Sequence, residues 1–380
     1  MKQIHLTFWF FLLLTACLKE TPIKNEYSGF EPITLNDGWM ISSPEQEGVN
    51  SSQIEEAYRQ LYAQDRFLRG KSLIVVRNGK IIAEAYPSND NHRNELNNIQ
   101  SCTKSVTSML LGIAIHQGFE ISEDELLFSY IPELFDSDVR KQQIKIKDAL
   151  TMQTGLTFDN SKHTRKLYQT SANSGEFVLS QSYQSTPGAT MHYNDGAPQL
   201  ISKLIEQKSG VKMTEFALHH LFNPLSITEW YWECAKDSTA FGAFSLYLKP
   251  RDLMKLGQLL LQNGNWNNNQ IINPSYLEKA TSSITPTNLE YDYGYYFWID
   301  SENDGYFAFG QGGQMMYMLN PSPFLGQLFL ILSCTNRPFW FRSTTGLEAL
   351  FQFLDAFFRG CKNTHILLPF DVSLNHRLAG

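Results

Sequence analysis

Residues 101–115 read SCTKSVTSMLLGIAI, a run of small and apolar residues that opens with a serine and a lysine three positions apart. Positions i and i+3 of a helix share one face, so Ser101 and Lys104 can point into the same cleft. A serine hydroxyl is a poor nucleophile until a base takes its proton, and a lysine can be that base if desolvation or a neighbouring cation lowers its pKa. The unpaired N–H groups at the start of the helix favour the serine anion. On spacing alone, an N-cap serine followed by a solvated lysine is the more common arrangement.

The composition is that of an ordered globular protein. Of the 380 residues, 42% are hydrophobic and 18% are charged, a balance that allows a large core and one or two domains. The net charge of −7 and the lack of a basic patch argue against a nucleic-acid partner. The sequence contains no G-x-S-x-G and no H-E-x-x-H motif, so neither an α/β-hydrolase triad nor a metal site is expected.

The first residues have the features of an export signal. Residues 6–14 are apolar but too few to form a stable membrane anchor, and they lead into Leu14-Thr15-Ala16-Cys17, which resembles a bacterial lipobox. We expect residues 1–16 to be a lipoprotein signal peptide and Cys17 to carry the lipid. Residues 17–40 would then be a polar tether that holds an exported protein to a membrane, on its periplasmic or cell-surface side. The alternative is an ordinary signal peptide with a chance cysteine.

The other cysteines are scattered and lack the spacing of a metal site: Cys102, Cys234, Cys334 and Cys361. An exported protein could pair some of them, but four cysteines allow three pairings and the sequence selects none. Cys102 is expected to be a small buried thiol beside the candidate nucleophile.

Strand patterns lie toward both ends of the chain. Two β-rich runs, residues 71–77 and 80–86, flank Asn78-Gly79, which is a strong hairpin signal. Further strands are predicted at 293–300, 305–309, 315–319 and 326–333, and helices at 54–68, 101–118, 196–208, 250–262 and 344–358. We therefore expect an α+β fold with an antiparallel sheet built from both chain ends, flanked by helices, and an inserted mainly helical domain. The expected bounds are residues 41–118 and 285–360 for the α/β domain, 119–284 for the helical domain, and 361–380 for a C-terminal tail.

Two further segments are candidates for chemistry. Tyr193-Asn194-Asp195 follows a Pro-Gly turn and precedes a predicted helix, which Asp195 is well placed to cap. A phenol near a lysine ammonium can take or relay a proton. Residues 310–314 are glycine-rich and lie between two predicted strands, where a backbone N–H could help form an oxyanion hole; a tight turn is the simpler interpretation. A second serine–lysine pair, Ser209 and Lys212, lies in a glycine-containing connection and need not share a face.

Three motifs, in their order and separation, resemble those of the serine β-lactamase and penicillin-binding-protein superfamily, specifically its class C-like serine hydrolases. They are Ser101-Cys102-Thr103-Lys104, Tyr193-Asn194-Asp195 and Gln311-Gly312-Gly313. The resemblance spans roughly residues 40–355 and implies a β-lactamase/DD-peptidase-like fold and no cofactor. It implies that Ser101 is the acylated nucleophile and that Lys104 and Tyr193 form the general base pair. The backbone N–H groups of Ser101 and Gln314 would form the oxyanion hole, and the implied substrate-binding residues are Asp195, Gln311, Gly312 and Gly313.

Two departures from the family pattern bear on the substrate. The second motif usually ends in Asn or Ser, whereas this chain has Asp195, and the third often begins with Lys or His, whereas this chain has Gln311. That cation generally meets the substrate carboxylate, so its loss weakens charge-assisted recognition worth about 1.5–3 kcal/mol. We expect an esterase or amidase acting on a small-molecule ester, amide or peptide-like substrate rather than an efficient β-lactamase. The alternative is a catalytically weak lipoprotein that binds cell-wall fragments or β-lactams; the sequence predicts no oligomeric state.

Overall fold

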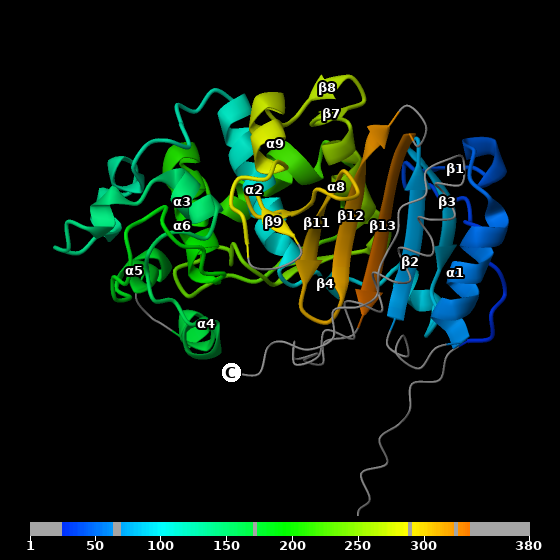
Figure 1. Cartoon of the computed structure of the whole chain (residues 1–380), viewed down its shortest axis with the longest axis horizontal. Coiled ribbons are helices and arrows are strands. Elements are labelled where there is room, and N and C mark those ends of the chain that lie inside the picture. Colours follow the sequence, from blue (N-terminus) through cyan, green and yellow to red (C-terminus); the bar gives the residue numbers. More distant parts are fainter. Residues whose placement is uncertain (1–24, 64–69, 170–172, 288–290, 323–325, 335–380) are drawn as a thin grey trace, which may run out of the picture.

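The computed structural model describes residues 25–63, 70–169, 173–287, 291–322 and 326–334. Its main layer is an eight-stranded sheet in the order β1-β3-β2-β13-β12-β11-β10-β9 (Figure 1). Neighbouring strands are antiparallel except for the short β1, which is parallel to β3. The strands are β1 (Met40–Ile41), β2 (Gly70–Arg77), β3 (Lys80–Ala85), β9 (Asp292–Tyr293), β10 (Trp298–Asp300), β11 (Gly305–Gly310), β12 (Gln314–Ser322) and β13 (Gly326–Cys334). Because β2 lies beside β13, the prediction of one sheet built from both ends of the chain is confirmed.

The β2–β3 hairpin turns at Asn78 and Gly79, as predicted. Both residues have positive φ, 51° and 75°, which is the backbone of the two-residue turn that follows the twist of the strands. The residues of β2 then alternate between the two faces of the sheet. Leu73 and Val75 pack on the face covered by α1 (Ser51–Ala63), whereas Ile74 and Val76 belong to the larger core on the other face.

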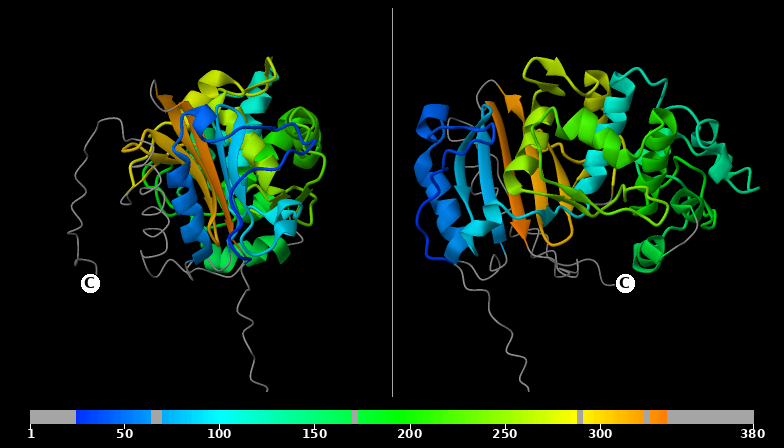
Figure 2. Two further views of the ribbon diagram at one scale, coloured as in Figure 1. Left: turned by 90° about the vertical axis from the view of Figure 1, so that its right-hand side faces the viewer. Right: turned by 180° about the vertical axis from the view of Figure 1, so that it is seen from behind.

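The larger core contains the remaining helices, which Figures 1 and 2 show beside the sheet, away from α1. α6 packs against α2, α3, α5 and α7, and α8 packs against β2, β12 and β13. The helices are α2 (Cys102–His116), α3 (Ile146–Leu150), α4 (Asn160–Gln169), α5 (Ser174–Leu179), α6 (Gly196–Ser209), α7 (Met213–Ala217), α8 (Pro250–Leu261) and α9 (Pro274–Ala280). A small sheet joins β4 (Asn97–Asn98), β6 (Leu246–Leu248) and β5 (Tyr231–Trp232), and β7 (Asn265–Trp266) pairs with β8 (Asn269–Gln270).

α2 lies between the sheet and α6, and all of its residues from Cys102 to Ala114 are buried. Its glycine, Gly112, permits the close approach of α9, because a Cβ there would lie 2.5 Å from the Tyr276 ring. Burial on all sides explains why the sequence of α2 is apolar and small all round rather than amphipathic. The helix that starts at the candidate nucleophile is therefore fixed along its whole length.

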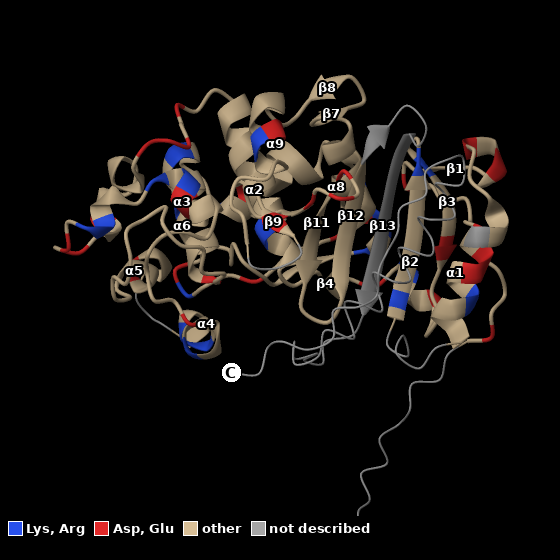
Figure 3. Ribbon diagram, viewed as in Figure 1, with Lys and Arg blue, Asp and Glu red and all other residues tan. Residues whose placement is uncertain are grey.

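A buried ion-pair network connects α8 to the sheet. The Arg251 guanidinium of α8 donates two hydrogen bonds to the Glu84 carboxylate of β3, at 2.7 and 2.9 Å, and one to Asp37 at 2.9 Å. Tyr86 also donates to Glu84, at 3.1 Å. Charged groups are otherwise spread over the helices with both signs intermixed, and Figure 3 shows no basic stripe in its view.

Three sequence predictions need correction or lie outside the described residues. The strand predicted at 293–300 is split into β9 and β10, because the chain turns between them, where Tyr296 has φ 64°. The helix predicted from residue 54 begins at Ser51, because the Asn50 side chain caps it by accepting the Ser52 N–H at 2.9 Å. The helix predicted at 344–358, the lipobox cysteine Cys17 and Cys361 lie outside the described residues. In the ranges given above, no helix has the length and apolar character needed to cross a membrane.

Candidate active site

The chain enters α2 through a constrained segment. Gln100, directly before Ser101, has φ 51°, a left-handed conformation that costs a non-glycine residue free energy. Its N–H donates to the side chain of Asn98 at 2.8 Å, and the N–H of Ile99 donates to the carbonyl of Leu246 in β6 at 2.8 Å. These bonds hold the strained backbone in place, and they position Ser101 at the first turn of a buried helix.

Ser101 and Lys104 are in direct contact. Lys104 Nζ donates to Ser101 Oγ at 2.9 Å, and the Ser101 side chain makes no capping hydrogen bond to α2. Lys104 is 1% exposed and also donates to the Asp195 carboxylate at 2.8 Å and to the Ala243 carbonyl at 3.1 Å. Each of its three protons therefore has an acceptor. The alternative of a capping serine and a solvated lysine is wrong.

The Asp195 side chain pairs with Lys104 and does not cap the helix that follows it. Its second carboxylate oxygen accepts a hydrogen bond from Thr164 of α4 at 2.6 Å, and its N–H donates to the Asn160 side chain at 2.8 Å. The Asn194 side chain caps α6 instead, because it accepts the N–H groups of the first two helical residues at 2.9 and 2.8 Å. The prediction that Asp195 caps α6 is therefore wrong.

The surroundings of Lys104 act on its pKa in opposite directions. Burial lowers the pKa, because it disfavours the charged form. The Asp195 carboxylate, which accepts a hydrogen bond from Lys104, and the neighbouring Tyr193 hydroxyl together outweigh burial, so the pKa of Lys104 stands above its usual value of 10.5. Lys104 is therefore an ammonium at neutral pH. A lowered pKa was the condition for Lys104 to act as a base by itself, and the structure does not meet it.

Tyr193 covers the lysine. Lys104 Nζ lies 4.9 Å from the centroid of the Tyr193 ring, within the range of a cation–π contact. The ring stacks on Trp298 of β10, at a centroid distance of 5.8 Å and an interplanar angle of 25°, and its edge meets Tyr293 of β9. The sheet therefore holds Tyr193 next to the Ser101–Lys104 pair, as the motif order predicts.

The glycine-rich segment is the tight turn between β11 and β12. Gly312 and Gly313 have φ of 88° and 89°, and the Gly313 N–H donates to the Gly310 carbonyl at 3.2 Å. The turn lies against the start of α2, because a Cβ on Gly310 would be 2.7 Å from the Ile99 carbonyl. Cys102 Sγ also donates to the Gln314 carbonyl at 3.5 Å. The backbone of Gln314 is thus beside Ser101, and the Gln311 side chain is exposed.

The beta-lactamase family model matches residues 54–339, which is most of the chain. This chain belongs to the beta-lactamase family. The chain is thus a member of the serine β-lactamase and penicillin-binding-protein superfamily that its three motifs resemble. No curated protein gives a significant sequence match.

Solved structures share the fold of this beta-lactamase-family chain at low sequence identity. A putative 6-aminohexanoate-dimer hydrolase from Bacillus anthracis is 18% identical, with a TM-score of 0.66 over 91% of this chain and 92% of its own. A D-amino acid amidase from Ochrobactrum anthropi is 18% identical, with a TM-score of 0.62 over 83% of this chain and 99% of its own. FmtA from Staphylococcus aureus is 16% identical, with a TM-score of 0.62 over 89% and 97%. At these identities the similarity shows the fold alone.

Sequence reasoning missed three contacts of this beta-lactamase-family site. Asn160 and Thr164 of α4 hold Asp195, and the Ala243 carbonyl accepts a hydrogen bond from Lys104. No motif marks these residues.

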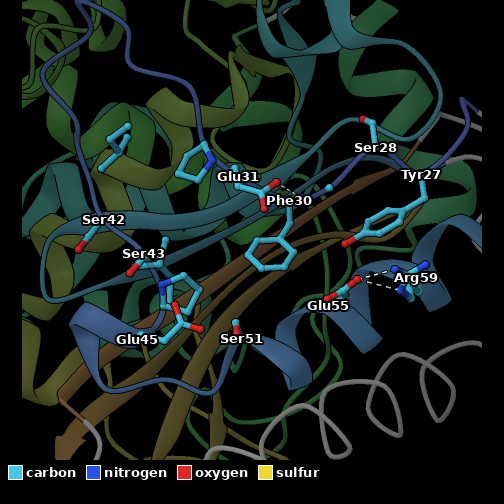
Figure 4. A pocket seen from close by; sticks show the side chains of 15 residues that line it. Tyr27, Ser28, Phe30, Glu31, Ser42, Ser43, Glu45, Ser51, Glu55 and Arg59 are labelled. Atoms are coloured by element: carbon cyan, nitrogen blue, oxygen red, sulfur yellow. Dashed lines mark hydrogen bonds and ion pairs between the residues drawn. The ribbon is translucent and has the colours of Figure 1, made fainter.

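A separate hollow of about 840 Å³ lies beside α1, away from the catalytic residues of the family. Residues of segments 27–32 and 41–45 line it, together with Ser51, Glu55 and Arg59 of α1 (Figure 4). Its lining contains none of Ser101, Lys104 and Tyr193, so its size does not make it the candidate active site.

Proposed function

We propose that this protein is a serine hydrolase that cleaves an ester or amide through an acyl-enzyme on Ser101. The observation that carries the proposal is the 2.9 Å hydrogen bond between Ser101 Oγ and the fully buried Lys104. A protein that only binds cell-wall fragments has no need for a buried lysine aimed at a serine, because burying an ammonium is costly unless it is paired. The half-buried Ser101 remains accessible to a substrate.

Because the pKa of Lys104 is raised, we propose that Lys104 and Tyr193 have different roles in the reaction. We assign removal of the Ser101 proton to Tyr193 acting as a phenolate beside the Lys104 ammonium, which stabilises the Ser101 oxygen as negative charge develops on it. The oxygen attacks the substrate carbonyl, and the proton passes through Tyr193 to the leaving alcohol or amine. Water then attacks the acyl-enzyme and loses a proton to Tyr193, which passes it to Ser101 Oγ as the bond between the acyl group and Ser101 breaks. The N–H groups of Ser101 and Gln314 stabilise the oxyanion, and each such donor is worth on the order of 10²–10³ in rate.

Gln311, the first residue of the third motif, supports a substrate that has no carboxylate where the family's cation would bind one. Gln311 is exposed and neutral where relatives often carry a cation, so it offers no charge-assisted bond to a β-lactam carboxylate. We therefore propose that short-chain esters or amides are hydrolysed faster than cephalosporins. The alternative of a weakly catalytic β-lactam binder makes the opposite prediction.

Labelling with a fluorophosphonate tests the nucleophile. The intact protein is expected to gain the mass of one adduct, and Ser101→Ala is expected to gain none. Ser209→Ala is the matched control, because Ser209 lies in the other serine–lysine pair and its hydroxyl bonds to the Ile205 carbonyl at 2.7 Å. It should label like the wild type. If neither the wild type nor Ser101→Ala is labelled, the hydrolase proposal is wrong and the binding protein is favoured.

Asp195→Asn tests the role of Lys104 through the pH profile of kcat/KM. Removal of the carboxylate is expected to lower the pKa of Lys104, because burial is then opposed by Tyr193 alone. If the ammonium is the active form, activity is lost as pH rises through this pKa, so the alkaline limb moves to lower pH. Thr164→Val keeps the Asp195 charge and should leave the limb near that of the wild type. A variant more active than wild type at neutral pH would show that Lys104 acts as a neutral base.

A further inference from the structure

A second carboxylate lies close to the proposed site. Glu233, directly after β5, is half-buried, and its N–H donates to the carbonyl of Ser245 at 3.1 Å. Ser245 is two residues beyond Ala243, whose carbonyl accepts a hydrogen bond from Lys104. The segment that borders Lys104 therefore also borders Glu233.

Neutral donors hold this carboxylate. One oxygen of Glu233 accepts a hydrogen bond from Tyr168 of α4 at 3.0 Å, and the other accepts one from Tyr247 of β6 at 3.1 Å. The Tyr168 hydroxyl is also 2.6 Å from the Ser245 hydroxyl. Among the described parts of the chain, no Lys, Arg or His side chain forms an ion pair with Glu233. The partners of the Glu233 carboxylate in these segments are therefore hydroxyl groups and not cations.

α4 fixes the separation between Glu233 and the catalytic pair. Thr164 and Tyr168 are four residues apart, one turn of the helix, or about 6 Å along its axis. Thr164 donates to Asp195, which pairs with Lys104, whereas Tyr168 donates to Glu233. The same helix thus bonds both Glu233 and the partner of Lys104, and we infer that the far end of a substrate bound at Ser101 extends toward Glu233.

Aromatic side chains occupy the space beside this carboxylate. The Tyr168 ring lies 4.3 Å from that of Phe241 and 5.2 Å from that of Phe244, which directly follows Ala243. Tyr168 is 39% exposed, and the Tyr247 ring lies 5.5 Å from the exposed Tyr231. A carboxylate among partly exposed tyrosine rings attracts an alkylammonium group by charge and by cation–π contact.

We propose that Glu233, with Tyr168 and Tyr247, binds a cationic ammonium at the far end of the substrate's acyl chain. The inference rests on the proposed function and specifies its substrate class. It agrees with the neutral Gln311, because neither feature favours an anionic substrate. A purely structural role, in which Glu233 only ties α4 to β6, predicts no dependence of the reaction on substrate charge.

Two p-nitrophenyl esters of the same shape separate these roles. One acyl chain ends in trimethylammonium and the other in tert-butyl, and both are prepared in a series of chain lengths. For the wild type, kcat/KM is expected to favour the cationic ester by about tenfold at the best length. Glu233→Gln is expected to abolish the preference and leave the neutral ester within about twofold. Glu229→Gln is the control and should keep the preference, because Glu229 is exposed and paired with Lys249.

Protection of Ser101 from the fluorophosphonate gives a second measurement, which does not require turnover. The cationic ester should protect the wild type at lower concentration than the neutral one, and Glu233→Gln should remove this difference. Equal behaviour of both esters toward a wild type that is labelled at Ser101 would overturn the ammonium site alone, as would an equal loss for both esters in Glu233→Gln. A wild type without labelling at Ser101 would overturn the hydrolase proposal itself.

Discussion

Lys104→Ala is expected to lower kcat/KM for a short-chain ester by about 10⁴-fold. The variant loses the donor that lies 2.9 Å from Ser101 Oγ and the positive charge that stabilises the developing alkoxide. It should also lower the free energy of unfolding by about 3–5 kcal/mol, because it leaves the Asp195 carboxylate buried without its cation. The Asp195 side chain is only 12% exposed. Steady-state kinetics and urea unfolding measure the two effects.

The double variant Lys104→Ala/Asp195→Asn separates catalysis from stability. It removes both charges, so most of the lost stability should return, whereas the activity should stay as low as in the single variant. A double variant that regains activity to within about tenfold of wild type would show that Lys104 acts only on the fold.

Arg251→Met is expected to lower the free energy of unfolding by about 3–5 kcal/mol, although Arg251 belongs to α8 and takes no part in the proposed chemistry. The change leaves Glu84, whose side chain is 1% exposed, without the guanidinium that donates to both of its oxygens. Burial opposes the charged form of Arg251, but Glu84 and Asp37 outweigh burial and raise its pKa. The guanidinium of Arg251 is therefore charged in the folded protein.

Lys249→Met is the matched control for the buried pair. Lys249 precedes α8, its side chain is 21% exposed, and it pairs with the exposed Glu229. Its loss should cost less than about 1 kcal/mol, as expected for a surface ion pair. Equal urea midpoints for the two variants would contradict a stabilising role for the buried network. Arg251→Met/Glu84→Gln should recover part of the loss, because it removes the buried Glu84 carboxylate, whose remaining ion-pair partner is Arg93 at 3.6 Å.

Local patterns predicted much of this fold because the features involved are short-range. Asn78-Gly79 specifies its hairpin through the positive φ that both residues tolerate. The spacing of Ser101 and Lys104 predicted that both lie on one helical face. The order of the motifs, through the family resemblance, predicted that Tyr193 and the 310–314 turn lie near them. The domain bounds and the lipid at Cys17 remain predictions.

What the sequence could not predict depends on contacts between distant segments. Asn194 and Asp195 are equally good caps in isolation, and only the charge of Lys104 decides which of them caps α6. Thr164 bonds to Asp195, which is 31 positions away in the sequence, and the Ala243 carbonyl accepts from Lys104, which is 139 positions away. A carbonyl acceptor has no side-chain signature, so no motif could have revealed it.

The position of α4 links two properties that are usually considered apart. Thr164 and Asn160 hold the carboxylate that sets the proton affinity of Lys104, while Tyr168, one turn further along, borders the wall where a substrate would extend. A shift of this helix that reshapes the wall also moves the hydrogen bonds on Asp195. If the proposed function holds, substrate preference and the working pH range are coupled traits, and selection for a new substrate at α4 would alter both together.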